Sequence, residues 1–329
     1  MRFIGFEGNQ DTKNLLSSFV DRGRIPHAIL IEGPQGSGRR TLAKIIAQAA
    51  VCSSGDEKPC GVCSHCRKAL SGNHPDIILA GGDGSSRSFH IDAVRQLRES
   101  AYILPNEAEH KVFILAGAEG MTEQAQNALL KILEEPPKHL IFILTCESRS
   151  QLLPTIQSRT VCLTVGAVDV DLAVNAIMRI LPETSPEEAR QAAAVFGGII
   201  GQAVNGISDG TFKQVVGLAP QIALAVAAPN EIDLLRLTGK IEKDKAACDG
   251  VLNTLSLIFR DALVLRSGYN SSISSSPDTA ASISKLLTKG QLAALVEEVD
   301  RLKRARLSNM NQTLFVTLMC SRLREAAGR

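Results

Sequence analysis

One stretch of sequence decides the fold of the first half of the chain: Gly33-Pro34-Gln35-Gly36-Ser37-Gly38-Arg39-Arg40-Thr41. It follows a short apolar run at 27–31 and precedes a segment with helical periodicity at 41–51. A glycine-rich turn between a buried strand and a helix is typical of a phosphate-binding loop, or P-loop, and the glycine spacing fits. The sequence therefore predicts a parallel α/β domain with this loop after one of its strands.

Further apolar runs at 111–116, 139–145 and 160–164 indicate three more buried strands. Between the first two, residues 122–135 have the pattern of a helix that Thr122 can cap and that Pro136-Pro137 ends. Buried strands that alternate with helices favour a parallel sheet.

From about residue 165 onward the pattern predicts helices and no strand. The run Ser185-Pro186-Glu187-Glu188 is a capping box that starts a helix. We expect a boundary with loop character at 207–220, and a surface loop in the Ser-rich stretch at 267–278.

The P-loop has lost the side chains that handle a nucleotide. A P-loop lysine reaches the phosphates and a Ser or Thr hydroxyl holds Mg²⁺, but Arg39 and Arg40 stand at these two positions. A one-residue slip would let Arg40 and Thr41 take the two roles, at the cost of a longer loop. Alternatively, the glycine turn is kept for packing, with at most an anion at the helix N-terminus.

A second loss agrees with the first. The strand at 111–115 ends in Ala116-Gly117, where a P-loop ATPase has metal-orienting acids, and Glu119 lies two residues too far along to substitute. We therefore expect that ATP is not bound and that the chain does not hydrolyse it.

Four of the eight cysteines lie close together, as Cys52, Cys60, Cys63 and Cys66. This spacing predicts a closed structural zinc site of four thiolates, although His65 could replace one ligand. An iron–sulfur cluster is disfavoured because Leu70 stands where a fourth cysteine would follow. Redox-active or unliganded thiols remain the alternatives.

Composition excludes some partners. With 36 basic and 34 acidic residues the net charge is only +2, so any contact with nucleic acid must come from a local patch. Aromatic residues make up 4% of the chain and tryptophan is absent, which argues against a base-stacking platform. The sequence carries neither a signal-peptide pattern nor an apolar run long enough to span a bilayer, so we expect a cytoplasmic protein without a membrane partner.

Several motifs together resemble the AAA+ clamp-loader subunits of bacterial DNA polymerase III, the gamma/tau and delta-prime branch. The resemblance covers most of the chain. Its carriers are Ile25-Pro26-His27-Ala28, Pro59-Cys60-Gly61-Val62-Cys63-Ser64-His65-Cys66, His74-Pro75-Asp76, the run from Asn127 to Pro137 (NALLKILEEPP) and Ser158-Arg159-Thr160. Weaker signals are Phe259-Arg260-Asp261-Ala262-Leu263 and Ser308-Asn309-Met310-Asn311.

The resemblance implies a RecA-like AAA+ domain at 1–165 with a zinc module at about 52–66, a helical lid at 166–208 and a helical collar at 209–329. It implies a subunit of the DNA-directed DNA polymerase III holoenzyme. The expected partners are gamma/tau ATPase subunits, the delta subunit, the sliding clamp and, through the assembled complex, primer–template DNA. Three departures point to the non-hydrolysing delta-prime type, with no intrinsic activity: the altered P-loop, the missing acids, and a lid in which Gly201 or its neighbour stands where an ATPase subunit carries its sensor arginine.

In this family an arginine that follows a serine enters the neighbouring subunit's ATP site as an arginine finger. Carried over, Arg159 is the expected finger, with Ser158 beside it and Thr160 in place of the usual cysteine. A plain surface arginine is the alternative. In the helix at 122–135, Gln126, Lys131 and Glu134 lie off the apolar face and could meet DNA or a neighbouring subunit, but for Lys131 a solvated lysine is the simpler interpretation.

Two other functions stay open at this stage. One is an active gamma/tau-type ATPase that tolerates Arg39. The other is a zinc-dependent nucleic-acid-binding module whose P-loop has no role.

Overall fold

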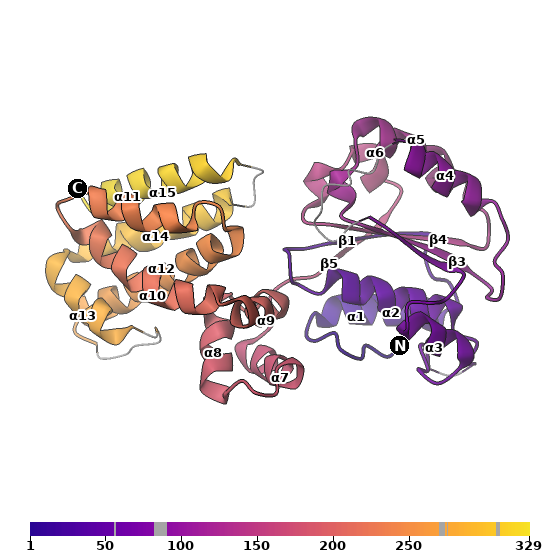
Figure 1. The fold of residues 1–329 in the computed structure, drawn as a ribbon, viewed down its shortest axis with the longest axis horizontal. Helices are drawn as coiled ribbons and strands as arrows, with labels where there is room; N and C mark the ends of the chain where they lie inside the picture. The colour runs from indigo at the N-terminus through magenta and orange to yellow at the C-terminus, as the bar shows by residue number, and fades with distance from the viewer. Residues whose placement is uncertain (56, 82–90, 270–273, 275, 307–309) are drawn as a thin grey trace. The chain divides into compact units, whose positions relative to one another are not determined.

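The computed structural model describes residues 1–55, 57–81, 91–269, 274, 276–306 and 310–329. The chain forms two units, Met1–Val168 and Asp169–Arg329, and Figure 1 shows the first as a sheet with helices on both faces and the second as helices. Among the described residues, no helix is long and apolar enough to cross a membrane.

A five-stranded sheet forms the middle of the first unit. Its strands are β1 (Ala28–Glu32), β2 (Ile77–Ala80), β3 (Lys111–Ala116), β4 (Leu140–Cys146) and β5 (Val161–Thr164). They lie in the order β2-β3-β4-β1-β5, and every neighbouring pair is parallel. The predicted parallel α/β sheet is therefore confirmed, and β2 is a strand that the sequence analysis did not identify.

Alternate residues of the central strands serve two cores, as a pleated strand requires. Ile29 and Ile31 of β1 pack with α1 (Gln10–Asp21) and α2 (Arg39–Val51) on one face. Ala28 and Leu30 pack on the other face with α4 (Ile91–Ala101) and α5 (Glu123–Glu134). The central strands β3 and β4 are buried along their whole length, which explains their continuous apolar sequences.

Short elements complete the first unit. They are α3 (Ser64–Leu70), the 3₁₀ turns η1 (Ala118–Gly120) and η2 (Arg149–Gln151), and α6 (Pro154–Gln157). The predicted cap of α5 is confirmed, since the Thr122 side chain accepts a hydrogen bond from the Ala125 N–H at 3.2 Å.

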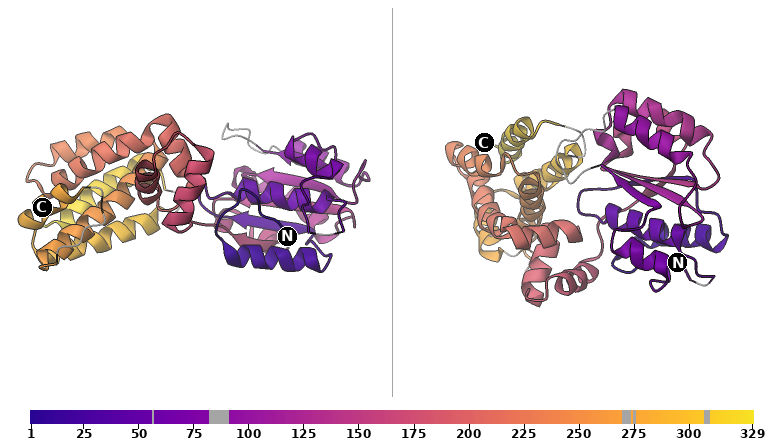
Figure 2. Two further views of the ribbon diagram at one scale, coloured as in Figure 1. Left: turned by 90° about the horizontal axis from the view of Figure 1, so that it is seen from below. Right: turned by 45° about the vertical axis from the view of Figure 1, so that its right-hand side comes forward.

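Among its described residues the second unit has helices and no strand, as predicted. Its helices are α7 (Val170–Ile180), α8 (Pro186–Val195), α9 (Ile200–Asp209), α10 (Thr211–Ala227), α11 (Ile232–Thr238), the 3₁₀ turn η3 (Gly239–Ile241), α12 (Lys245–Arg266), α13 (Pro277–Leu286), α14 (Lys289–Ala305) and α15 (Gln312–Ala326). The long helix α12 packs against α10, α13 and α14, and its Phe259 is fully buried. Figure 2 shows these helices from two further sides.

The prediction of loop character at 207–220 is wrong, because α10 begins at Thr211 and continues through Pro220. A proline inside a helix removes one backbone hydrogen bond and crowds the preceding turn. Here Pro220 has no N–H to donate to the Val216 carbonyl, and the Gln221 side chain donates to the neighbouring Gly217 carbonyl at 2.9 Å. Burial of the apolar face of α10 supplies the remaining stabilisation.

Two predicted segments fall partly outside the described residues. They are the Ser-rich stretch at 267–278 and the motif at 308–311. Asn311, which is described, caps α15 by accepting a hydrogen bond from the Leu314 N–H at 3.2 Å.

Candidate functional site

The glycine loop lies at the carboxyl end of β1. Because β1 stands between β4 and β5, its carboxyl end is where the chain order reverses, and ligands of parallel sheets bind at such a point. Gly36 and Gly38 adopt positive φ angles of 83° and 92°, which favour glycine. A Cβ at Gly33 would lie 2.0 Å from the Val165 carbonyl oxygen, so only glycine fits there.

Arg39 is the first residue of α2 and faces Glu119 across the loop. Its Nη1 lies 4.0 Å from the Glu119 Oε1, and the two side chains are only 13% and 24% exposed. Spacing along the sequence predicts that Glu119 lies too far along to take part, and this prediction is wrong. The chain instead turns at Gly117, with φ of 76°, into η1, and this turn brings Glu119 back to the P-loop. An internal cation–carboxylate pair therefore occupies the region where a P-loop ATPase holds phosphate and metal.

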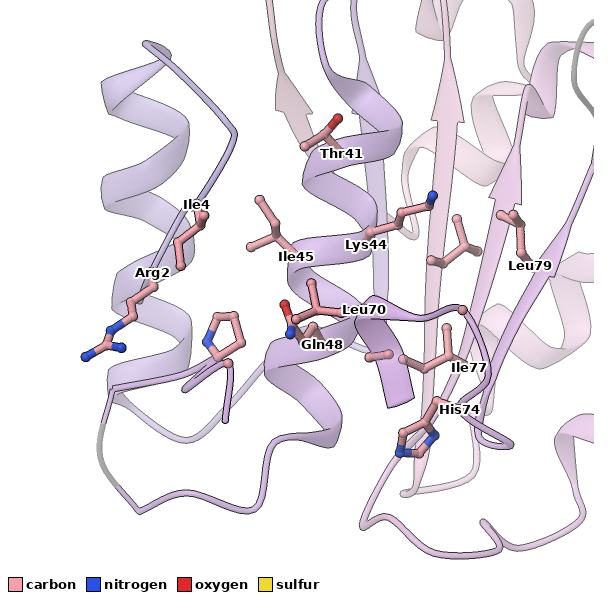
Figure 3. Close-up of a pocket in the computed structure, with 15 residues that line it drawn as sticks. Arg2, Ile4, Thr41, Lys44, Ile45, Gln48, Leu70, His74, Ile77 and Leu79 are labelled. Carbon is pink, nitrogen blue, oxygen red and sulfur yellow. The ribbon is translucent and has the colours of Figure 1, made fainter. Parts of the chain in front are cut away.

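The next two residues of α2 are exposed to solvent. Arg40 and Thr41 both lie on the surface, and Thr41 forms part of the wall of a cavity along α2, together with Arg2 and Ile4. Figure 3 shows Thr41 on this side of the helix.

The four clustered cysteines converge. Cys52 ends α2, Cys60 and Cys63 flank the loop before α3, and Cys66 lies within α3. Their sulfur atoms all lie within 4.8 Å of one another, and those of Cys60 and Cys66 are 3.9 Å apart. A tetrahedral ion with zinc–sulfur bonds of about 2.3 Å requires sulfur separations of roughly 3.8 Å. The four thiols can therefore hold a metal ion.

Backbone N–H groups point at the sulfurs and favour thiolates. The N–H groups of Cys60, Cys63 and Cys66 donate to the sulfurs of Cys52, Cys60 and Cys63, each at 3.4 Å. Burial alone would raise the pKa of Cys63, but the N–H donors of Cys66 and Ser53 lower it to about 6. In Cys66, burial dominates and raises the pKa.

Neither nearby histidine is needed as a ligand. Nδ1 of His74 accepts the N–H of Asp76 at 3.1 Å, so Nε2 carries the proton of the neutral ring and meets Nδ1 of His65 at 3.0 Å. Burial lowers the pKa of His74, which favours this neutral form.

Asp76 connects the His65–His74 pair to the segment that leads into β3. Its fully buried carboxylate accepts hydrogen bonds from the backbone N–H groups of Asn106, Glu107 and Ala108 at 2.6, 2.8 and 2.9 Å. The Asn106 side chain adds a fourth at 3.1 Å. The motif at 74–76 thus has a structural role, which we call the Asp76 brace: it holds the segment at 106–108 next to the start of β2. Its sequence alone did not indicate this role.

Arg159 lies at the opposite edge of the sheet from the P-loop. It lies two residues before β5, and the first residues of β5 pair with the start of β1. Its Nη1 donates to the Thr155 carbonyl at 3.0 Å and to the Ser158 Oγ at 3.2 Å, while Nη2 lies 2.6 Å from the Glu134 Oε1. The guanidinium group lies in an open groove that Pro26 and His27 also line.

Gln126 and Lys131 of α5 lie in different environments. Helical spacing predicts that both lie off the apolar face and open to a partner, and this prediction is wrong for Gln126, which is 5% exposed. Its Oε1 accepts a hydrogen bond from the Leu153 N–H at 2.8 Å, so Gln126 holds the residue that directly precedes α6. Lys131 is exposed, as expected.

Comparison with known proteins adds family information. The family described as "DNA polymerase III, delta subunit" matches residues 8–169, and that described as "DNA polymerase III, delta subunit, C terminal" matches residues 222–324.

Two curated relatives and one solved structure illustrate the similarity. The chain is 40% identical over 159 residues to the DNA polymerase III subunit gamma/tau of Mycobacterium tuberculosis strain H37Rv. This alignment covers 48% of this chain and 27% of that protein. It is 37% identical over 145 residues to the DNA polymerase III subunit delta' of Bacillus subtilis, which covers 44% of each chain. The aligned part thus spans less than half of either relative. A crystal structure of a gamma subunit-related protein from Thermotoga maritima aligns over 97% of this chain and 99% of its own, with 18% identity and a TM-score of 0.41.

Proposed function

Because this chain belongs to the DNA polymerase III subunit family that includes delta-prime and gamma/tau, we propose that it is a non-hydrolysing, delta-prime-type subunit of the bacterial clamp loader. In this role it closes an arc of AAA+ subunits and supplies Arg159 to the ATP site of a neighbouring gamma/tau-type subunit. The assembly, with a delta subunit, loads the sliding clamp on primed DNA.

The placement of Arg159 is the observation that carries the proposal. Arg159 lies at the end of the sheet where the parallel strands begin, and the P-loop lies at the end where they finish. The two are separated by at least the length of β1, about 13 Å at roughly 3.3 Å per residue. An arginine side chain cannot bridge that distance, which supports a role for Arg159 at the ATP site of another subunit rather than at its own P-loop. A guanidinium there stabilises the charge on the transferring phosphoryl group.

The state of the chain's own P-loop supports the lack of hydrolysis. Arg39 and Glu119 face each other where phosphate and metal would bind, and neither Arg39 nor Arg40 offers an oxygen ligand for Mg²⁺. The subunit would then transmit ATP turnover in its neighbour without turnover of its own.

The cysteine cluster is proposed to hold one structural Zn²⁺. An all-sulfur set of four suits zinc and leaves no open position for water. Bound there, the ion would supply a cross-link between the end of α2 and α3.

ATP hydrolysis by the purified chain, alone and then with its gamma/tau-type partner, tests the proposal. We expect no turnover alone, and partner turnover that Arg159→Ala lowers by a factor on the order of 10³. Arg149→Ala, which removes a well exposed arginine at the other edge of the sheet, is the matched control. Appreciable turnover by the chain alone would favour the active-ATPase alternative. Salt-dependent DNA binding by the chain alone, lost on zinc removal, would favour the nucleic-acid-binding module.

A further inference from the structure

A cavity of about 360 Å³ opens beside α2 in the first unit. Its inner wall is apolar, with Ile45 of α2, Ile77 of β2 and Ile114 of β3. Figure 3 shows α2, which contributes Ile45 and Lys44 to the wall, between Ile4 on one side and Leu79 on the other. None of the residues that line it lines the Arg159 groove. This cavity is therefore separate from the proposed arginine-finger site.

Large apolar side chains continue from the cavity onto the surface around it. Ile4, Leu70 and Leu79 line the cavity and are 78%, 70% and 55% exposed. Single exposed apolar residues are common, but three that line one cavity together with its apolar wall are typical of an interaction site. We call the cavity together with these three residues the α2 groove.

The fold explains why the α2 groove is open. Strand β2 lies at the edge of the sheet, so no strand of the described sheet extends the layer beyond it. Ile77 and Leu79 point to the same face of β2 because they are two residues apart. On α2 the lining residues Thr41, Lys44, Ile45 and Gln48 have the spacing of one helix face. The short helix α3 leaves this face partly uncovered.

The described residues that line the groove include the basic side chains Arg2 and Lys44 and no carboxylate. Arg2 is paired with Glu57 at 2.8 Å, whereas Lys44 is exposed and makes no ion pair with any described residue. His74, the third ionisable group of the lining, is largely buried and has a lowered pKa. The groove therefore favours an occupant that carries negative charge beside apolar groups.

We propose that the α2 groove docks an acidic amphipathic segment of a partner protein. Apolar side chains of that segment enter the cavity and cover Ile4, Leu70 and Leu79, and a carboxylate of the segment pairs with Lys44. A small amphiphile that fits inside the cavity would leave the exposed apolar surface around it in water. A longer segment covers both, and this difference favours a protein partner.

Selection from a random twelve-residue peptide library displayed on phage, with the full-length chain as bait, tests the proposal. The double variant Lys44→Gln/Leu70→Ser serves for counter-selection. We expect the enriched peptides to combine at least two large apolar residues with a net negative charge. Their affinity is expected to fall about tenfold with Leu70→Ser and about threefold with Lys44→Gln, as loss of a buried leucine and of an exposed ion pair imply.

Matched controls are Ile103→Ser and Lys138→Gln, which remove an exposed apolar and an exposed basic side chain outside the groove. Both should bind the selected peptides like the unchanged chain, and unfolding curves show whether each variant is folded. Enriched peptides without acidic residues, or binding that Leu70→Ser leaves unchanged, would overturn the proposal, as would the absence of enrichment. Binding of decanoate that depends on Lys44 and Leu70, without any enriched peptide, would assign the cavity to a small amphiphile. Self-association that Leu70→Ser abolishes would assign it to a second copy. Because the test uses this chain alone, it is independent of the outcome for Arg159.

Discussion

Nη2 of Arg159 lies 2.6 Å from Oε1 of Glu134, so the proposed finger is held by a carboxylate from α5. A guanidinium group has five N–H donors. Glu134, Thr155 and Ser158 engage three of them, which leaves two for phosphate oxygens. Glu134 is thus a positioning residue for Arg159, since it fixes the guanidinium while part of it stays open.

Glu134→Gln should therefore weaken the effect of Arg159 without abolishing it. The amide keeps an acceptor of the same shape but loses the charge, and exposed ion pairs contribute about 0.2–1 kcal/mol, or roughly 1.5- to 5-fold in rate. We expect partner ATP turnover to fall by about that factor in kcat, with KM unchanged. Glu135→Gln, at the adjacent exposed position, is the control. An unchanged kcat alongside a large effect of Arg159→Ala would show that the pair is incidental.

Loss of the carboxylate that faces Arg39 should destabilise the first unit. Glu119 is the only partner within ion-pair distance that the described residues offer Arg39, and Nη1 of Arg39 is buried without a hydrogen-bond partner. Glu119→Gln removes the compensating charge, so we expect the free energy of unfolding to fall by about 1–2 kcal/mol. Urea unfolding at pH 7 measures this, with the exposed Glu109→Gln as control. Equal losses in the two variants would contradict a role for the pair.

The Asp76 brace should make the free energy of unfolding fall as the solution becomes acidic. Burial alone would raise the pKa of Asp76, but its N–H donors lower it below the ordinary value of 3.8. A group whose pKa is lower in the folded state stabilises the fold above its unfolded-state pKa. That stabilisation is lost as the pH falls below 3.8 and through the folded-state value.

Asp76→Asn tests this brace. The amide can accept from some donors but places an NH₂ group against others, so we expect a loss of about 3 kcal/mol at pH 7. Urea unfolding of both proteins between pH 7 and pH 3 should show the difference narrowing at the acid end. A constant difference would mean that the carboxylate charge does not contribute.

The parts of the fold that could be predicted are those whose signal is local. β1, β3 and β4 are apolar over consecutive residues because helices cover both faces of the central sheet. β2 was missed because it is an edge strand of four residues that is never fully buried. The helix through Pro220 was missed because a tertiary contribution, burial of its apolar face, outweighs a local helix-breaking residue.

The candidate site also has features that local sequence patterns predict and features that only the fold reveals. The glycine spacing and the cysteine spacing are local patterns, and the structure brings the four cysteines together. The approach of Glu119 to Arg39 depends on one positive-φ turn at Gly117, which spacing along the sequence does not reveal. The pairing of Glu134 with Arg159 joins α5 to the segment before β5, residues that are distant in the chain and adjacent only in the folded sheet.

The cysteine cluster leads to a prediction that is independent of any clamp-loader assay. We expect one equivalent of zinc in the purified chain by atomic emission, and its loss with Cys66→Ser, because three sulfurs cannot close a tetrahedral site. Cys248→Ser, a buried cysteine of the second unit, should keep the metal. Chelation should lower the unfolding temperature of the first unit and expose 52–70 to hydrogen exchange, since metal binding contributes to folding. Iron in place of zinc, or a metal content that Cys66→Ser leaves unchanged, would overturn the assignment.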